Sequence, residues 1–167
     1  AGILVVLLAL GGMPIFDSFV HAFGAAGTGG FGIKANSVAY YNSAYIDYLL
    51  AISMILFGVN FNLYYAVLFM RMKNIFKNEE LRWYFGFIAV GFTLICINVS
   101  PLYSSVALLL RDVFFTVSSI ITATGYATAN FDTWPVFSHV ILIFLMFVGG
   151  MVGSTAGGIK VSRIAIY

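Results

Sequence analysis

A short pattern of glycine, threonine and an aromatic residue occurs twice in this sequence. Residues 27–31 read Gly-Thr-Gly-Gly-Phe, and residues 122–126 read Thr-Ala-Thr-Gly-Tyr. In each copy, the glycine before the aromatic residue lies thirteen positions after an aspartate, Asp17 or Asp112. A cation that leaves water needs other oxygens, and the carbonyls and threonine hydroxyls of an extended strand supply them. The repeated pattern therefore predicts an ion-conducting pore built from two loops.

The candidate ion ligands are the residues of these two loops. Glycine permits backbone angles that turn carbonyl groups towards a pore. The aromatic residue that follows can wedge against surrounding helices and hold the strand open. We expect a cation to bind at the backbone carbonyls of a selectivity filter. Its predicted residues are Thr28, Gly29, Gly30, Phe31, Thr122, Ala123, Thr124, Gly125 and Tyr126.

Each loop follows a short apolar stretch, residues 17–26 or residues 112–121. A membrane-spanning helix needs about 20 residues, so these stretches fit re-entrant helices that are buried in protein or line water. Asp17 and Asp112 are expected to cap the outer N-termini of these helices, where a carboxylate is favourable. The helix C-termini then direct partial negative charge at the pore centre, which favours cations.

The composition indicates that lipid is the solvent around these loops. The chain is 62% hydrophobic and 8% charged, with a mean hydropathy of +1.02, which is too little charge for a soluble surface. A net charge of +2 is too small to suggest nucleic acid. We expect an all-α membrane protein of tandem helix–pore-loop–helix repeats, as in potassium channels. The expected spans are residues 1–16, 45–70, 84–109 and 136–166.

Basic residues predict the orientation in the membrane. Six fall on one side, which the positive-inside rule makes cytoplasmic, and two fall on the other. The cytoplasmic set is Arg71, Lys73, Lys77, Arg82, Lys160 and Arg163, and the outer set is Lys34 and Arg111. The chain therefore divides into a repeat at 1–70 with a truncated first helix, a cytoplasmic loop at 71–83 and a complete second repeat at 84–167.

The last expected span contains a glycine-rich break at residues 149–158. Five of these ten residues are glycine, and each glycine costs about 1 kcal/mol relative to alanine in a helix. We expect the helix to unwind there and to form a gate below the filter, although a close-packed face of small residues is an alternative. The corresponding residues 58–62 contain one glycine and are expected to stay helical.

No arrangement of residues suggests catalysis. Residues 27–32 match a dinucleotide-binding glycine pattern, but no strand precedes them and no βαβ unit surrounds them. His21 and His139 stand alone without partners at metal-ligand spacing, so we interpret them as packing or interface residues. We therefore expect a protein that is not an enzyme and that has no cofactor of its own.

The two loops, Asn60-Phe61 and residues 153–160 together resemble the Trk/Ktr/HKT superfamily of potassium transporters, and its TrkH branch most. The resemblance implies four helix–pore-loop–helix repeats around one pore, with this chain covering the second and third. It implies that K⁺ binds at the filter carbonyls and is taken up into the cell. It also implies an intramembrane gating loop, followed by a lysine. The predicted gate residues are Gly149, Gly150, Gly153, Ser154, Thr155, Gly157, Gly158 and Lys160.

The resemblance implies partners as well. These are a second copy in a homodimer, a cytoplasmic nucleotide-binding regulatory subunit of the TrkA type, and the remaining repeats of the same transporter. The location implied is the lipid bilayer of the bacterial inner membrane, crossed several times. The residues alone leave open the choice between K⁺ and Na⁺, the coupling ion, and whether the chain is a fragment.

Two other functions remain as alternatives. A secondary transporter for sodium or another solute would use broken helices to bind its substrate near the midplane. It would usually need inverted repeats and an ionisable group at mid-depth, whereas the charge count makes these repeats parallel. A membrane fragment that does not conduct is the third interpretation.

Overall fold

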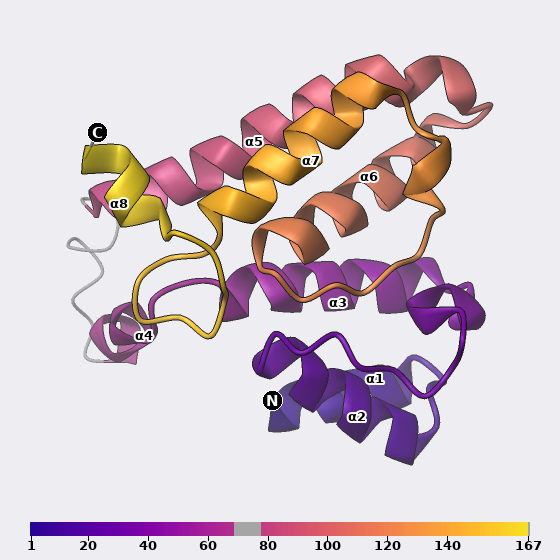
Figure 1. The fold of residues 1–167 in the computed structure, drawn as a ribbon. Helices are drawn as coiled ribbons and strands as arrows, with labels where there is room; N and C mark the ends of the chain where they lie inside the picture. Colours follow the sequence, from indigo (N-terminus) through magenta and orange to yellow (C-terminus); the bar gives the residue numbers. More distant parts are fainter. Residues whose placement is uncertain (69–77, 167) are drawn as a thin grey trace.

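The computed structural model describes residues 1–68 and 78–166 of the chain (Figure 1). Within these residues all regular secondary structure is helical: α-helices and short 3-10 turns, with no strand. The elements are α1 (Gly2–Leu10), α2 (Ile15–Ala26), η1 (Ser37–Tyr41), α3 (Ala44–Phe57), α4 (Phe61–Leu68), α5 (Glu79–Val99), η3 (Ser100–Leu102), α6 (Val106–Ile121), η4 (Phe131–Thr133), α7 (Val136–Val148) and α8 (Val161–Ile166).

The order of the elements repeats once along the chain. A first unit runs α1, α2, η1, α3, α4, and a second runs α5, η3, α6, η4, α7, α8, which adds the short turn η3 between its first two helices. In both units the first helix is followed by a second helix, which ends in a loop. A 3-10 turn and a third helix come next, and a break separates the third helix from a short last helix. The expected all-α fold with tandem repeats is therefore confirmed. Arg71, Lys73 and Lys77 of the predicted cytoplasmic loop lie outside the described residues.

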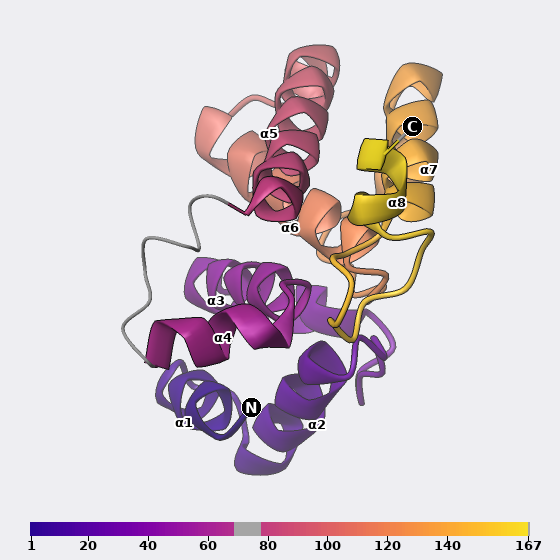
Figure 2. The same ribbon diagram turned by 90° about the vertical axis from the view of Figure 1, so that its left-hand side faces the viewer.

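Helix α3 lies between the two halves of the structure. Figures 1 and 2 show α1 and α2 on one side of it and α5, α6 and α7 on the other, and α3 packs against both α2 and α6. Buried apolar residues form one cluster around α5, α6 and α7 and another around α1, α2 and α3. Phe115 and Tyr126 of the second unit belong to the cluster of the first unit, so the units share a core.

One described helix is long and apolar enough to cross a membrane by itself. It comprises Glu79–Leu102, α5 together with η3. Helices α2, α3 and α7 are apolar but shorter. The expected spans at 45–70 and 136–166 are each two helices separated by a break, and α4 and α8 are the short pieces after the breaks.

The expectation that residues 58–62 stay helical is wrong. Helix α3 ends at Phe57, and α4 begins at Phe61. Gly58 is packed so closely that an added Cβ would lie 2.3 Å from the hydroxyl oxygen of Tyr84. The carbonyl of Gly58 accepts a hydrogen bond from the backbone of Met151 at 3.0 Å instead of continuing the helix. Contacts with the second unit, rather than the number of glycines, stabilise this break.

The expected boundaries of the third span and of the second re-entrant helix are also wrong. The third span ends near Leu102 instead of residue 109, after Pro101 has closed the short turn η3. Helix α6 then begins at Val106, six residues before Asp112, and is 16 residues long. The residues before Asp112 are apolar enough to belong to either helix, and the turn at Pro101 decides between them.

Asp17 and Asp112 do not cap their helices. Asp17 is the third residue of α2, which follows Pro14 with no side-chain cap, and Asp112 lies within α6. Asp17 accepts a hydrogen bond from the Tyr41 hydroxyl, and Asp112 accepts one from Tyr103 at 3.0 Å. Burial and the neighbouring carboxylates raise the pKa of both tyrosines, that of Tyr103 to about 12, so both hydroxyls stay protonated. The two aspartates thus connect η1 to α2 and the residue after η3 to α6.

An ion pair between Asp47 of α3 and Arg111 of α6 joins the two units. The Arg111 Nε lies 2.6 Å from the Asp47 carboxylate, and the exposed fractions of the two side chains are 16% and 1%. Arg111 belongs to the predicted outer set, and nothing in the sequence predicts its pairing with Asp47. Removing one partner of a buried ion pair costs about 3–5 kcal/mol, because the other charge is left unpaired.

We expect Asp47→Ala to lower the free energy of unfolding by about 3 kcal/mol. The measurement is chemical or thermal unfolding of the purified protein in detergent. Asp132→Ala is the matched control, because Asp132 is exposed on η4, and we expect it to change stability by no more than about 0.5 kcal/mol. Equal losses in the two variants would contradict a stabilising role for the pair.

Candidate pore loops and gate

The two predicted filter segments leave their helices with the same backbone hydrogen bonds. We call residues 27–31 loop A and residues 122–126 loop B. Three bonds at the end of α2 have counterparts 95 residues later at the end of α6, at distances between 2.8 and 3.3 Å. The pairs are Gly27 N to Phe23 O and Thr122 N to Ser118 O; Thr28 N to Ala25 O and Ala123 N to Ile120 O; and Gly29 N to Gly24 O and Thr124 N to Ser119 O.

The backbone angles of the loops match as well. Thr28 and Ala123 have φ of 51° and 56°, and Gly30 and Gly125 have φ of 66° and 85°. Glycine adopts positive φ readily, whereas a residue with a Cβ pays roughly 1–2 kcal/mol. Thr28 and Ala123 therefore hold strained conformations at equivalent positions. Such strain concentrates at functional sites, where the surrounding structure maintains it.

Loops A and B touch each other through their glycine-containing backbones and their aromatic positions. A Cβ added to Gly30 would lie 1.9 Å from the carbonyl oxygen of Thr124, so the two backbones are in direct contact there. The hydroxyl of Tyr126 donates to the carbonyl of Phe31 at 3.1 Å. The structure thus brings together the glycines and aromatic residues that the sequence pattern pairs.

The two aromatic residues differ in their surroundings. Tyr126 is buried and wedged against α2, as expected, and its exposed fraction is 3%. The side chain of Phe31 is 79% exposed and wedges against no helix of the described residues, contrary to expectation. The hydroxyl of Tyr126 can donate to a carbonyl in the protein interior, and phenylalanine has no hydroxyl with which to do so.

The threonine hydroxyls of the loops donate to protein oxygens. The Thr122 hydroxyl lies 2.7 Å from the carbonyl of Ser118 and 2.8 Å from the Thr124 hydroxyl. The Thr28 hydroxyl lies 2.8 Å from the carbonyl of Gly27 and 2.9 Å from that of Thr155. These bonds fix the side chains, so the backbone carbonyls are the principal candidates for ion ligands.

The expected break in the last span is present between α7 and α8. We call residues 149–160 the glycine-rich loop. Its first residue, Gly149, lies directly beside Gly158 near its end, since a Cβ on Gly149 would lie 2.7 Å from the Cα of Gly158. Positive φ at Gly149, Gly153, Gly158 and Lys160 bends the backbone into this closed shape. The Lys160 ammonium binds the carbonyl of Ala156 within the loop.

The glycine-rich loop contacts both pore loops. The carbonyl of Thr155 accepts from the Thr28 hydroxyl of loop A at 2.9 Å. On the other side, a Cβ added to Gly157 would lie 3.2 Å from the Cβ of Ala123 in loop B. Figure 2 shows this loop, in yellow-orange, beside the end of α2. The structure therefore places the predicted gate directly against the predicted filter.

The glycine-rich loop also meets the break of the first unit. The backbone N–H of Phe61 donates to the carbonyl of Gly153 at 3.0 Å, which complements the bond from Met151 to Gly58. A carboxylate oxygen of Glu80 accepts from the backbone of Val152 at 2.7 Å. Two chain breaks at equivalent places in the two units thus face each other.

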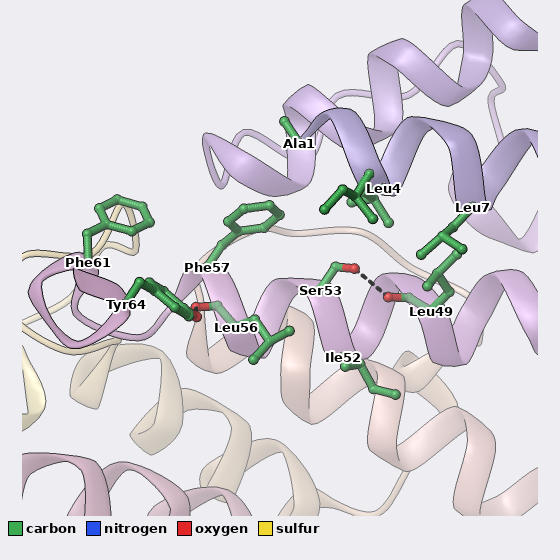
Figure 3. Close-up of a pocket in the computed structure, with 11 residues that line it drawn as sticks. Ala1, Leu4, Leu7, Leu49, Ile52, Ser53, Leu56, Phe57, Phe61 and Tyr64 are labelled. Atoms are coloured by element: carbon green, nitrogen blue, oxygen red, sulfur yellow. Dashed lines mark hydrogen bonds between the residues drawn. The ribbon is translucent and has the colours of Figure 1, made fainter. Parts of the chain in front are cut away.

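A separate apolar cavity lies between α1, α3 and α4. Its volume is about 490 Å³, and Figure 3 shows that aliphatic and aromatic side chains line it. The Ser53 hydroxyl at its wall donates to the carbonyl of Leu49 at 2.7 Å. None of its lining residues belongs to loop A, loop B or the glycine-rich loop. In the described part of the chain, no cluster of His, Cys, Asp or Glu could hold a metal ion.

Sequence reasoning missed several residues that shape the loops. Gly24 and Gly58 provide room for the hydroxyls of Tyr126 and Tyr84, which a Cβ would approach within 2.2 and 2.3 Å. His21 was interpreted as a packing residue, and the structure places its ring against Tyr126. The presence of a glycine at position 24, one turn before loop A, was a signal that a neighbouring group needs room there. No neighbouring residue in the sequence indicated that His21 would contact Tyr126.

Known proteins are similar to this chain in sequence and in fold. The chain matches the TrkH family model, described as a cation transport protein, over residues 5–167. It is 36% identical over 161 residues to the Trk system potassium uptake protein TrkH of Escherichia coli (strain K12), and 35% identical over 159 residues to TrkH of Salmonella typhimurium. Each match covers 93% of the chain and 33% of the relative, so the chain spans about a third of their length.

A solved structure agrees with the fold. The crystal structure of the potassium transporter TrkH from Vibrio parahaemolyticus superposes with a TM-score of 0.92 at 30% identity. The superposition covers 97% of this chain and 36% of that one. Sequence and fold thus agree over almost all of the chain, which belongs to the TrkH family of cation transport proteins.

Proposed function

We propose that this chain forms part of a pore for potassium uptake, with K⁺ bound at the backbone carbonyls of loops A and B. The observation that carries the proposal is the duplicated backbone of the two loops and their direct contact at Gly30 and Thr124. Carbonyl-lined filters replace the water around a dehydrated cation. The relatives' names, as potassium uptake proteins, support K⁺ as the ion.

The electrostatics of the loops favour cations. Helices α2 and α6 both end at the loops, so the partial negative charges of their C-termini lie there. Loops A and B contain no charged residue. The carbonyl dipoles therefore dominate the local field without an acidic side chain that would hold a cation too tightly.

The glycine-rich loop is the proposed gate. It lies against Thr28 of loop A and Ala123 of loop B, where a cation leaving the filter would pass. Most of its backbone bonds to other described residues lie at its two ends, whereas residues 151–157 are held by the bonds from Met151 to Gly58 and from Phe61 to Gly153. A segment so attached can move without unfolding the helices on either side.

The proposed assembly is larger than this chain. We infer that the remaining repeats of the same transporter complete the ring around the pore, in a multi-pass protein of the bacterial inner membrane. The homodimer and the TrkA-type cytoplasmic regulatory subunit belong to the same proposal. The division at 1–70, 71–83 and 84–167 is part of the same proposal, with the difference that α5 already begins at Glu79, within the proposed loop.

A secondary transporter for sodium or another solute is the second candidate. The observation in its favour is that both units contain a broken helix and that the two breaks bind each other. Broken helices coordinate ions in many such transporters. The two units run in parallel order, however, and the breaks carry no carboxylate or ammonium apart from Lys160.

Growth of a bacterium that lacks potassium uptake tests the proposal. We expect the full transporter containing this chain to restore growth at low potassium, and Gly125→Ser in it to abolish growth. The serine would be forced to φ +85°, which strains loop B although nothing blocks its Cβ. Expression of the chain alone shows whether two repeats suffice. Failure of the intact, membrane-inserted transporter to restore growth would contradict potassium uptake and favour the second candidate.

A further inference from the structure

A cluster of buried aromatic side chains lies behind loop B. His21 of α2 is fully buried, and its ring stacks on that of Tyr126, with the ring centroids 5.3 Å apart and the planes at 23°. His21 belongs to the first unit and Tyr126 to the second. Their contact therefore connects the two units immediately beside the proposed filter.

Other contacts fix the orientation of the His21 ring. Its Nδ1 donates to the carbonyl of Asp17 at 2.8 Å, one helical turn earlier. Tyr41 packs its edge against the same ring, with centroids 5.6 Å apart at 85°, and donates its hydroxyl to the Asp17 carboxylate. The imidazole is thus held from two sides before it meets Tyr126, and it presents a rigid surface to that ring.

Tyr126 transmits this rigidity to loop A. Its hydroxyl donates to the carbonyl of Phe31 at 3.1 Å, and its own carbonyl accepts from the Ser119 hydroxyl at 2.7 Å. Gly24 provides the space, because a Cβ there would lie 2.2 Å from the Tyr126 hydroxyl oxygen. A single side chain therefore sets the separation between the carbonyl-bearing backbones of the two loops.

We propose that His21 is a positioning residue for ion selectivity, which clamps Tyr126 and so fixes the spacing between loops A and B. The spacing and stiffness of carbonyl ligands determine which dehydrated cation they stabilise. His21 itself does not contact the ion. This inference rests on the proposed function, since the spacing matters only if both loops line the ion path.

The test measures the K⁺/Na⁺ permeability ratio of the full transporter in liposomes. His21→Asn keeps a donor near the Nδ1 position and removes the ring, and Tyr126→Phe keeps the ring and removes the hydroxyl. We expect each to lower the ratio roughly twofold to tenfold, the range that one lost hydrogen bond supports. Because both act through the bond from Tyr126 to Phe31, the double variant should lose no more than the larger single loss.

The other histidine supplies the matched control. His139 lies on α7, and its Nε2 is 2.9 Å from the carbonyl of Phe131 in η4, so its hydrogen bond goes to neither loop A nor loop B. We expect His139→Asn to leave the permeability ratio unchanged. A ratio is independent of how much protein inserts, so reduced folding of a variant does not imitate a change in selectivity.

Each outcome decides one question. If the unaltered transporter selects K⁺ and His21→Asn does so equally well, the positioning role is overturned and the proposed function stands. Additive losses in the double variant would also overturn it, because His21 would then act independently of Tyr126. If His21→Asn does not assemble, an unchanged ratio in Tyr126→Phe is the overturning result. An unaltered transporter without K⁺ selectivity would overturn the proposed function and this inference together.

Discussion

Gly30→Ala is expected to abolish most potassium uptake by the full transporter. The added Cβ would lie 1.9 Å from the carbonyl oxygen of Thr124, and the backbone at Gly30 has φ of +66°. Overpacking costs about 1–3 kcal/mol, and an alanine at positive φ adds roughly 1–2 kcal/mol. The two loops would have to separate to relieve the overlap between the added Cβ and the Thr124 carbonyl. We therefore expect uptake to fall by more than about tenfold, the change that 1.4 kcal/mol produces.

Gly86→Ala is the control for this substitution. Gly86 lies within α5 at ordinary helical φ, and a Cβ there would meet nothing within 4 Å. Alanine is the better helix former, so we expect normal uptake and equal or slightly higher stability. Initial rates of rubidium or potassium uptake, normalised to inserted protein, compare the two variants. Normal uptake by Gly30→Ala would show that loops A and B do not form the ion path together.

Deletion of residues 150–157 is expected to raise cation flux. Because Gly149 and Gly158 are already adjacent, joining them closes the gap without pulling α7 and α8 out of place. If the glycine-rich loop obstructs the pore, its removal lowers the barrier below the filter. We expect uptake to rise by about tenfold, which corresponds to a barrier lowered by roughly 1.4 kcal/mol.

Two further measurements make this deletion decisive. The K⁺/Na⁺ permeability ratio should stay the same, since the deletion removes no residue of loops A and B and the Thr28 hydroxyl keeps its bond to Gly27. An unchanged ratio distinguishes a gate from a filter. Thermal unfolding of the purified variant establishes that it folds. Unchanged flux in a folded and conducting deletion variant would contradict the gate assignment.

The loops could be predicted from the sequence because their constraints are local. Positive φ at Gly30 and Gly125 favours glycine, and the matched distance from Asp17 and Asp112 reflects a duplicated unit. The break at residues 149–158 was equally visible, since five glycines cannot maintain a helix. In these segments the glycines indicate the backbone, whereas the positive φ of Thr28 and Ala123 is not predictable from their residue types.

The features that escaped prediction depend on contacts between distant residues. The helix breaks at Gly58 because Met151 and Tyr84 occupy the space and bonds around it, and no neighbour in sequence indicates this. Asp47 and Arg111, 64 residues apart in the sequence, pair only after the two units pack together. The positioning role proposed for His21 likewise depends on its contact with Tyr126 of the second unit, which the sequence does not show.

The aspartates show how a correct pattern can carry a wrong explanation. Their equal spacing to the loops suggested helix caps, since both precede apolar stretches. The helices in fact begin two residues before Asp17 and six before Asp112, and each carboxylate binds a tyrosine hydroxyl. The same residue type therefore occupies both positions, and it makes a different bond from the one expected.

Rubidium uptake by the purified full transporter in liposomes tests the central claim most directly. Radioactive rubidium, which behaves like potassium, is supplied outside the liposomes with an excess of either K⁺ or Na⁺. The account predicts rapid uptake that K⁺ blocks and that the same concentration of Na⁺ leaves nearly unchanged. Equal block by Na⁺, or no uptake by a folded and inserted protein, would contradict a potassium filter formed by loops A and B.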